Sequence, residues 1–361
     1  MSLMSLLNEL PQYWAEGAIR ELEGFRRGLS ETYPIEDDPP PLTPYTVVYE
    51  GGKVSLRRYQ AQGTVRHKTP LLICYALIKR PYVLDLLPGR SLIETLTKKG
   101  LEVYLIDWIP PTRADSWRGF DAYVNEDIAN AVRAVQLCED IERISLLGYC
   151  FGGMLSTIYT ALHQETIKNF VALTLPLDLS VRDIPLNSTM DHVSEETINL
   201  ITETFGNCPA ALMKAGFSSM APIHHALDKY IGLYRNKENK GYPEMFDLFE
   251  RWMSGEVPLA GRIFRELILD VTRKNLLVQS QFVVGGRKVE LKNITCPVLN
   301  VVADRDDVVA PRSSLPFIDL IGSDDKANLV FPTGHVGAIV SGAAQKLLWP
   351  QVAAWLADHD G

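Results

Sequence analysis

The sequence lacks the cysteine and histidine spacing of a metal site or a disulfide framework. It has five cysteines, an odd number, and no C-x-x-C pair joins any two of them. Neither an H-x-x-x-H nor an H-E-x-x-H spacing occurs among the seven histidines. The pattern predicts reduced thiols in a cytoplasmic protein and no metal site.

Long apolar runs and blocks of basic residues are also missing. The first residues, MSLMSLLNEL, have no basic segment and no apolar stretch before a cleavage site, so no signal peptide is predicted. Other apolar stretches are far too short to cross a bilayer. The net charge is −8, without a Lys/Arg-rich block. We therefore expect no nucleic-acid partner and no transmembrane segment.

What is present is a chain of 361 residues, 46% of them hydrophobic, which is enough for a large core. Apolar spacing over residues 1–30 predicts an amphipathic helix, and the prolines at 39–41 a linker, so 1–41 form an N-terminal helix and linker. That helix either packs on the rest of the protein or offers a docking surface for a partner. Tyr45–Glu50 and Val54–Tyr59 flank two glycines and predict a β-hairpin.

From residue 70 onward, short apolar strands alternate with segments long enough for crossover helices. This rhythm predicts an α/β protein with a mostly parallel sheet covered on both faces. The alternation is absent over 176–295, where helices are expected at 195–205 and 243–270. We therefore assign 176–295 to an inserted, mostly helical cap. The core of the α/β fold is assigned to 42–175 and 296–361. The predicted strands are 70–77, 101–108, 143–149, 169–175, 296–303 and 327–331.

The segment LLGYCFGG at 146–153 contains the strongest single motif. An apolar strand leads into G-x-C-x-G-G, followed by a helical run, which is the pattern of a nucleophile elbow with cysteine in place of serine. Gly148 and Gly152 would let the strand and the helix approach closely, while Cys150 sits in the strained turn at a helix N-terminus that favours a thiolate. By itself, the motif also fits a buried structural cysteine.

Two further residues follow strands in the chain order expected for a hydrolase-type triad. Asp306 comes after strand 296–303 and His335 after strand 327–331, where open α/β sheets place their sites. His335 would take the thiol proton of Cys150, and Asp306 would orient the imidazole. The backbone N–H groups of Phe151 and Ile78 are the expected oxyanion hole.

The chain resembles the catalytic subunit of polyhydroxyalkanoate synthases, of the short type that works with a second subunit (classes III and IV), within the α/β-hydrolase superfamily. The resemblance covers nearly the whole chain. It rests on LLICYALIKRPYVLD, VYLIDW, LLGYCFGG, TFGN, RW, ITCPVLNVVADRDD and FPTGHVGAIVSG.

The resemblance implies an acyltransferase that polymerises (R)-3-hydroxyacyl-CoA, with short side chains such as 3-hydroxybutyryl, into a storage polyester. It identifies the positions of Cys150, Asp306 and His335 as nucleophile, aspartate and general base, with an acyl thioester on the cysteine and release of CoA. It further implies a homodimer, a hetero-complex with the second subunit and a cytoplasmic location at the surface of polyester granules. No cofactor is expected, because the coenzyme A thioester is the substrate.

Four positions depart from the family pattern. Asp307 stands where histidine is usual, Lys79 replaces an asparagine, Ile109 a glycine and Ala310 a proline. Asp307 raises the question of which aspartate faces the histidine, and counting without gaps from Cys296 and from Ser314 favours Asp306. Two other functions remain open: a cysteine hydrolase of the dienelactone-hydrolase or thioesterase kind, and a weakly active scaffold that binds granules or a partner. The large cap argues against the hydrolase, since a covered site disfavours water.

Overall fold

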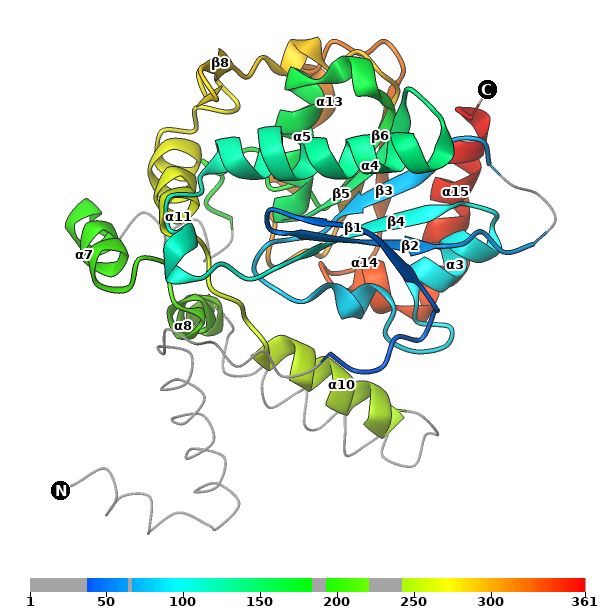
Figure 1. The fold of residues 1–361 in the computed structure, drawn as a ribbon, viewed down its shortest axis with the longest axis horizontal. Coiled ribbons are helices and arrows are strands. Elements are labelled where there is room, and N and C mark those ends of the chain that lie inside the picture. Colours follow the sequence, from blue (N-terminus) through cyan, green and yellow to red (C-terminus); the bar gives the residue numbers. More distant parts are fainter. Residues whose placement is uncertain (1–37, 64–66, 184–192, 221–241, 361) are drawn as a thin grey trace.

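The computed structural model describes residues 38–63, 67–183, 193–220 and 242–360. The predicted N-terminal helix over 1–30 lies outside these ranges. A single sheet of eight strands, in the order β1-β2-β4-β3-β5-β6-β9-β10, forms the centre of the fold (Figure 1). The strands are β1 (Thr46–Gly51), β2 (Val54–Tyr59), β3 (Leu71–Cys74), β4 (Val103–Trp108), β5 (Ile144–Tyr149), β6 (Ile167–Leu173), β9 (Val298–Ala303) and β10 (Lys326–Phe331).

The predicted hairpin and mostly parallel sheet are confirmed. β1 pairs antiparallel with β2 and β2 antiparallel with β4, whereas every pair from β4 to β10 is parallel. All residues of β3, β4, β5 and β9 are buried, which explains their continuous apolar sequences. β10 is less buried, with only Phe331 fully inside, because it is the edge of the sheet.

Helices cover both faces of the sheet. α4 (Ala129–Glu139) and α5 (Phe151–Leu162) lie on one face, and α3 (Leu92–Lys98), α14 (Gly337–Val340) and α15 (Trp349–Asp358) lie on the other (Figure 1). A π-helical stretch, η3 (Ala122–Ile128), leads into α4. The shorter helices are η1 (Pro81–Leu84), η2 (Arg113–Asp115), η4 (Gln164–Thr166), η6 (Leu291–Asn293), α12 (Pro311–Ser314), α13 (Phe317–Leu320) and η7 (Ala344–Leu348).

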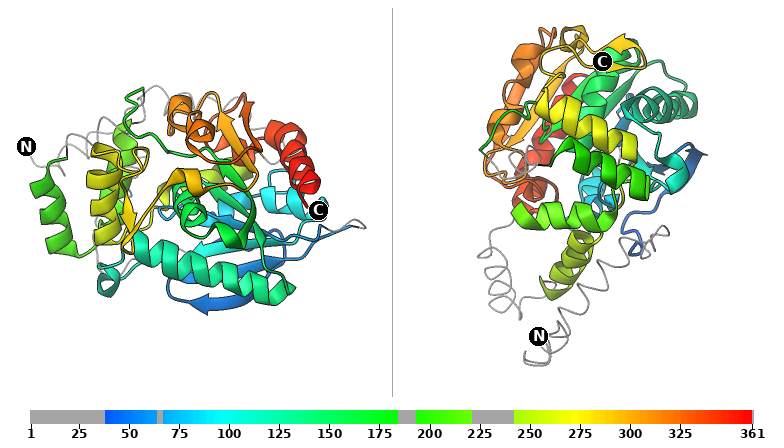
Figure 2. Two further views of the ribbon diagram at one scale, coloured as in Figure 1. Left: turned by 90° about the horizontal axis from the view of Figure 1, so that it is seen from above. Right: turned by 90° about the vertical axis from the view of Figure 1, so that its left-hand side faces the viewer.

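The segment between β6 and β9 is mostly helical, as expected for a cap. Its elements are α7 (Glu195–Phe205), α8 (Ala210–Met220), α10 (Tyr242–Ser254), α11 (Gly261–Glu266), η5 (Leu267–Arg273), β7 (Val283–Val284) and β8 (Arg287–Lys288). Its helices, green to yellow in Figure 2, lie at the end of the molecule opposite the red α15. The core and cap boundaries at 175/176 and 295/296 stay a prediction.

The helical structure expected around 243–270 is present but interrupted. α10 ends at Ser254, α11 begins at Gly261, and the residues between them are not helical. Two of these residues form isolated β-bridges, Glu256 with Lys79 and Leu259 with Cys208. Pro258 cannot continue a helix, which gives the break a local cause. α8 and the β7–β8 hairpin were not predicted.

The turn from β5 into α5 brings two glycines against neighbouring backbone. A Cβ on Gly148 would lie 2.6 Å from the Cα of Gly153. A Cβ on Gly152 would lie 2.6 Å from the carbonyl oxygen of Tyr75 and closer still to that of Cys74. Backbone atoms cannot move aside as a side chain can, so both positions require glycine.

We expect Gly152→Ala to lower the free energy of unfolding by about 1–3 kcal/mol, because α5 or the end of β3 has to shift to admit the methyl group. Urea denaturation measures this difference. Gly216→Ala is the matched control, since a Cβ there meets no atom of the described residues within 4 Å. Equal stability of Gly152→Ala and the wild type would contradict the close approach.

Candidate active site

Cys150 occupies the turn between β5 and α5. Its φ of 54° is left-handed, which is unusual for a residue other than glycine. Its backbone N–H donates to the carbonyl of Leu173 at 3.0 Å, which ties the turn to the end of β6. The side chain is partly buried and lies at the N-terminus of α5. The geometry is that of the predicted nucleophile elbow.

His335 and Asp306 form a buried pair beside this turn. Nδ1 of His335 lies 2.7 Å from Oδ2 of Asp306, and both residues are less than 10% exposed. The second carboxylate oxygen, Oδ1, accepts hydrogen bonds from the backbone N–H groups of Val308 (2.8 Å) and Val309 (2.7 Å). The carboxylate is therefore fixed from both sides. Asp307 is exposed, so of the two adjacent aspartates it is Asp306 that meets the histidine.

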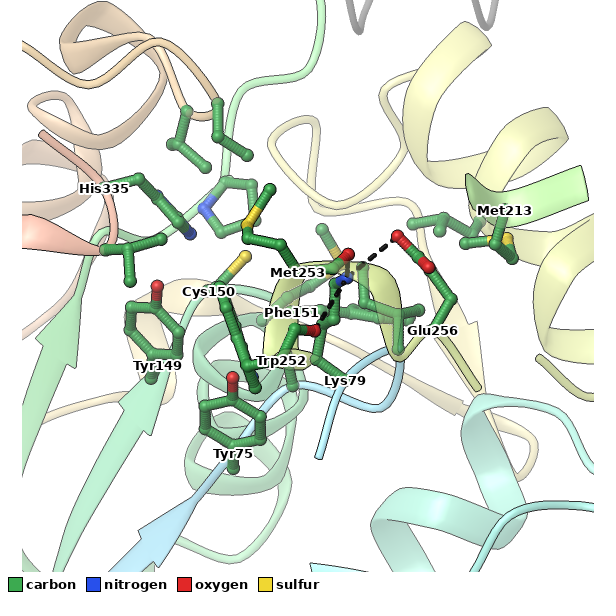
Figure 3. A pocket seen from close by; sticks show the side chains of 18 of the residues that line it. Tyr75, Lys79, Tyr149, Cys150, Phe151, Met213, Trp252, Met253, Glu256 and His335 are labelled. Carbon is green, nitrogen blue, oxygen red and sulfur yellow. Dashed lines mark hydrogen bonds and ion pairs between the residues drawn. The ribbon is translucent and has the colours of Figure 1, made fainter. Parts of the chain in front are cut away.

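The surroundings of His335 favour its charged form. Burial lowers the pKa of the imidazole, but the charges of Cys150 and Asp306 and its hydrogen bonds with both side chains outweigh burial. The pKa of His335 is therefore raised above its ordinary value. Figure 3 shows the imidazole and the sulfur on the same side of the site. The structure thus brings the three predicted triad residues together.

Two tyrosines that the sequence reasoning did not single out flank the cysteine. Tyr75 and Tyr149 stack at a ring-centroid distance of 5.5 Å, and Tyr149 lies 5.1 Å from the His335 ring (Figure 3). Burial raises the pKa of both phenols, so their hydroxyls stay neutral donors. Their positions at the ends of β3 and β5 are the one signal in the sequence that could have marked them.

The two predicted oxyanion residues lie at the same cavity as Cys150. Phe151 begins α5, and Ile78 lies in the loop after β3, which ends three residues earlier than predicted. The carbonyl of Ile78 accepts a hydrogen bond from the N–H of Val257 at 3.3 Å, which links this loop to the cap. The role of the two backbone N–H groups as donors to a substrate oxygen stays a prediction.

The cavity has a volume of about 190 Å³ and an almost wholly apolar wall. Core and cap both contribute to it, since Met213 comes from α8, Trp252 and Met253 from α10 and Leu267 from η5 (Figure 3). The other residues that line it are Tyr75, Ala76, Ile78, Lys79, Tyr149, Cys150, Phe151, Met154, Pro176, Leu179, Glu256, Val308, Val309, His335 and Val336.

One ion pair lies in this apolar wall. Nζ of Lys79 is 2.8 Å from Oε1 of Glu256, and the side chains are 11% and 4% exposed. The ammonium also donates to the backbone carbonyls of Trp252 and Met253 at the end of α10. Lys79 was noted from the sequence only as a departure from the family pattern, and Glu256 was missed.

The described ranges contain no group of three or more His, Cys, Asp or Glu side chains placed to hold a metal ion. None of the helices in those ranges combines the length and the apolar character that a membrane span requires.

Comparison with solved structures places this arrangement in a known fold. The α/β hydrolase fold family matches residues 69–341. The monoacylglycerol lipase of Paleococcus ferrophilus superposes with a TM-score of 0.53 at 14% identity, covering 85% of this chain and all of the lipase. A hydrolase from Pseudomonas aeruginosa gives 0.51 at 16% identity, covering 87% of this chain and 97% of its own. At such identities the likeness shows the fold alone, and the predicted α/β-hydrolase fold is confirmed.

Comparison with curated proteins is more specific. The chain is 36% identical over 317 residues to the Poly(3-hydroxyalkanoate) polymerase subunit PhaC of Allochromatium vinosum, covering 87% of this chain and 88% of that protein. The protein of the same name from Synechocystis is 34% identical, with 93% and 91% covered. The one from Haloferax mediterranei is 35% identical over 88% of this chain, which spans 64% of that relative. The predicted resemblance to polyhydroxyalkanoate synthases is confirmed, and with it the enzyme class, an acyltransferase that polymerises hydroxyacyl groups. The chain belongs to the poly(3-hydroxyalkanoate) polymerase subunit PhaC family of the α/β hydrolase fold.

Proposed function

We propose that this chain polymerises (R)-3-hydroxyacyl-CoA with short side chains through an acyl thioester on Cys150. The observation that carries the proposal is the Cys150–His335–Asp306 arrangement beneath an apolar cavity of about 190 Å³. Ligand pockets commonly measure about 300–1,000 Å³, so this cavity favours a small acyl group.

In the acylation step the Cys150 sulfur attacks the thioester carbonyl carbon, and His335 holds the thiol proton. The tetrahedral intermediate collapses, the bond from carbon to the CoA sulfur breaks, and His335 gives its proton to the departing thiolate. The backbone N–H groups of Phe151 and Ile78 would stabilise the oxyanion. One thioester is exchanged for another, so the acyl group stays activated.

In the elongation step the 3-hydroxyl of another hydroxyacyl unit attacks the acyl group on Cys150. The hydroxyl proton passes to His335, an ester bond forms, and the Cys150 thiolate is released. Asp306 keeps the imidazole oriented through its 2.7 Å contact with Nδ1 and stabilises its charged form in both steps. The ester is less activated than the thioester, which drives the cycle forward.

A cysteine hydrolase would use the same groups with water in place of the hydroxyl. The cavity wall disfavours this reaction, because nearly all of the lining is apolar and offers water few hydrogen bonds. We further propose a homodimer that works with a second synthase subunit at the surface of cytoplasmic polyester granules. This part of the proposal rests on the family resemblance.

Incubation of the purified chain with (R)-3-hydroxybutyryl-CoA, with and without a short-type second subunit, tests the reaction. We expect release of CoA together with polymer, stimulation by the second subunit, and no release by Cys150→Ala, which has no thiol to acylate. Thiol titration measures the CoA released, and chromatography identifies the acyl product. Free 3-hydroxybutyrate in place of polymer would make the chain a hydrolase, and release that does not depend on Cys150 would overturn the proposal.

Asp306→Asn should lower the rate of CoA release by about 10²–10⁴-fold, because the amide neither fixes the imidazole tautomer nor stabilises its charge. Loss of the carboxylate also lowers the pKa of His335, so NMR titration should find the imidazole losing its proton at a lower pH than in the wild type. The adjacent, exposed Asp307 supplies the control, since Asp307→Asn should leave the rate within about twofold. A larger loss in Asp307→Asn than in Asp306→Asn would reverse the assignment.

A further inference from the structure

One polar group on the cavity wall has no role in the reaction derived above. The phenol of Tyr149 ends β5, directly before Cys150, and lines the cavity. Among the described residues its hydroxyl forms no hydrogen bond. The hydroxyl is not enclosed either, so a molecule in the cavity can reach it. Interior tyrosine hydroxyls usually have a partner, which leaves this one available to a ligand.

The other polar side chains of the wall, apart from the triad, are already paired or out of reach. Lys79 pairs with Oε1 of Glu256, while Oε2 of the same carboxylate is inaccessible. The indole N–H of Trp252 donates to a backbone carbonyl at 3.0 Å. The hydroxyl of Tyr75 interacts with this indole. Among the described residues that line the cavity, Tyr149 therefore supplies the available side-chain hydroxyl.

Three contacts hold the Tyr149 ring in place before a ligand arrives. Its backbone pairs with Leu173 of β6 in the sheet. Its ring stacks on Tyr75 at a centroid distance of 5.5 Å and packs at a tilt against His335 at 5.1 Å. Figure 3 shows its hydroxyl end turned toward the side of the site that holds the His335 imidazole and the Cys150 sulfur. A group bound to this hydroxyl therefore lies beside the imidazole.

This arrangement places a hydrogen-bond donor next to a base. Nδ1 of His335 is occupied by Asp306, so Nε2 is the nitrogen left to take a proton. Burial and nearby charges raise the pKa of Tyr149, so the phenol keeps its own proton and acts as a donor. An alcohol fits both groups, because its O–H donates to a base while its lone pairs accept from a donor. Of the groups that react in elongation, only the 3-hydroxyl has this character, since the thioester carbonyl only accepts.

We propose that the Tyr149 hydroxyl donates a hydrogen bond to the attacking 3-hydroxyl of the hydroxyacyl unit and so directs its O–H toward His335. This assignment rests on the proposed function, because it takes an acyl group on Cys150 as the target of the attack. The 3-hydroxyl oxygen bonds to the acyl carbon, its proton passes to Nε2 of His335, and the bond from that carbon to the Cys150 sulfur breaks. Tyr149 neither gives nor takes a proton, and it acts as a substrate-binding residue.

The kinetic test follows one acyl group from Cys150 to two different acceptors. Butyryl-CoA, which has no 3-hydroxyl, loads Cys150 with an acyl group, and mass spectrometry of the protein measures how much of it remains. Methyl (R)-3-hydroxybutyrate removes this group through a hydroxyl, whereas excess CoA removes it through a thiol, whose sulfur is a weak acceptor. Tyr149→Phe deletes only the phenol oxygen, so transfer to the ester should slow about tenfold while transfer to CoA stays within about twofold. Unchanged transfer to the ester, or equal slowing of both transfers, would overturn the proposal.

Tyr159 on α5 offers a matched control. It is as buried as Tyr149, at 2% exposed, and its ring lies 4.8 Å from that of His163. Its hydroxyl bonds to Oγ1 of Thr166 at 3.1 Å, and it does not line the cavity. Tyr159→Phe should leave both transfers within about twofold of the wild type. Selective slowing of transfer to the ester in this variant would mean that loss of any buried phenol has the same effect, which would also overturn the proposal.

A binding measurement separates failure of this assignment from failure of the proposed reaction. Methyl (R)-3-hydroxybutyrate should protect Cys150 from iodoacetamide at a lower concentration than methyl butyrate, which lacks the hydroxyl. In Tyr149→Phe this advantage should fall about threefold to tenfold. The readout needs no acyl transfer. An advantage that is absent in the wild type or survives in Tyr149→Phe would overturn the assignment even if polymer forms. Loss of the advantage in a protein that never becomes acylated would support the hydroxyl site and reject the reaction.

Discussion

The close packing of β5, α5 and the end of β3 is the constraint on which the rest of the site depends. α5 begins directly against the backbone carbonyls of Cys74 and Tyr75, immediately after the turn in which Cys150 has its left-handed φ of 54°. The same approach places the loop after β3 beside the cysteine. A side chain on Gly152 would separate these elements, so one glycine determines where the sulfur and the expected oxyanion donors lie relative to each other.

Most of the core could be predicted from the sequence because its signals are local. Each parallel strand is a short apolar run. The candidate catalytic residues follow the carboxyl ends of such strands, as Cys150 follows β5 and Asp306 follows β9. Chain order then limits the triad to few candidates. Counting along the sequence favoured Asp306 over Asp307, but it gave no physical reason for the choice, which lies in the Val308 and Val309 amides that hold the Asp306 carboxylate.

The cap was less predictable because its structure depends on contacts distant in sequence. The break between α10 and α11 follows from Pro258 together with the pairing of Glu256 with Lys79, 177 residues away along the chain. Glu256 looked like a surface residue, since glutamate is almost never buried without a partner. Its partner, Lys79, was visible only as a residue that departs from the family pattern, and only the structure joins the two.

The distribution of polarity around the cavity explains how an esterase-like triad could favour an alcohol over water. In the proposed reaction, a thioester on Cys150 would react with whichever hydroxyl reaches it, so selectivity has to come from the surroundings. An apolar wall formed by Met213, Trp252 and Leu267 stabilises an acyl chain and offers water little to bind. The cap is therefore part of the chemistry of this site as well as its cover, because without it the same triad would face open solvent.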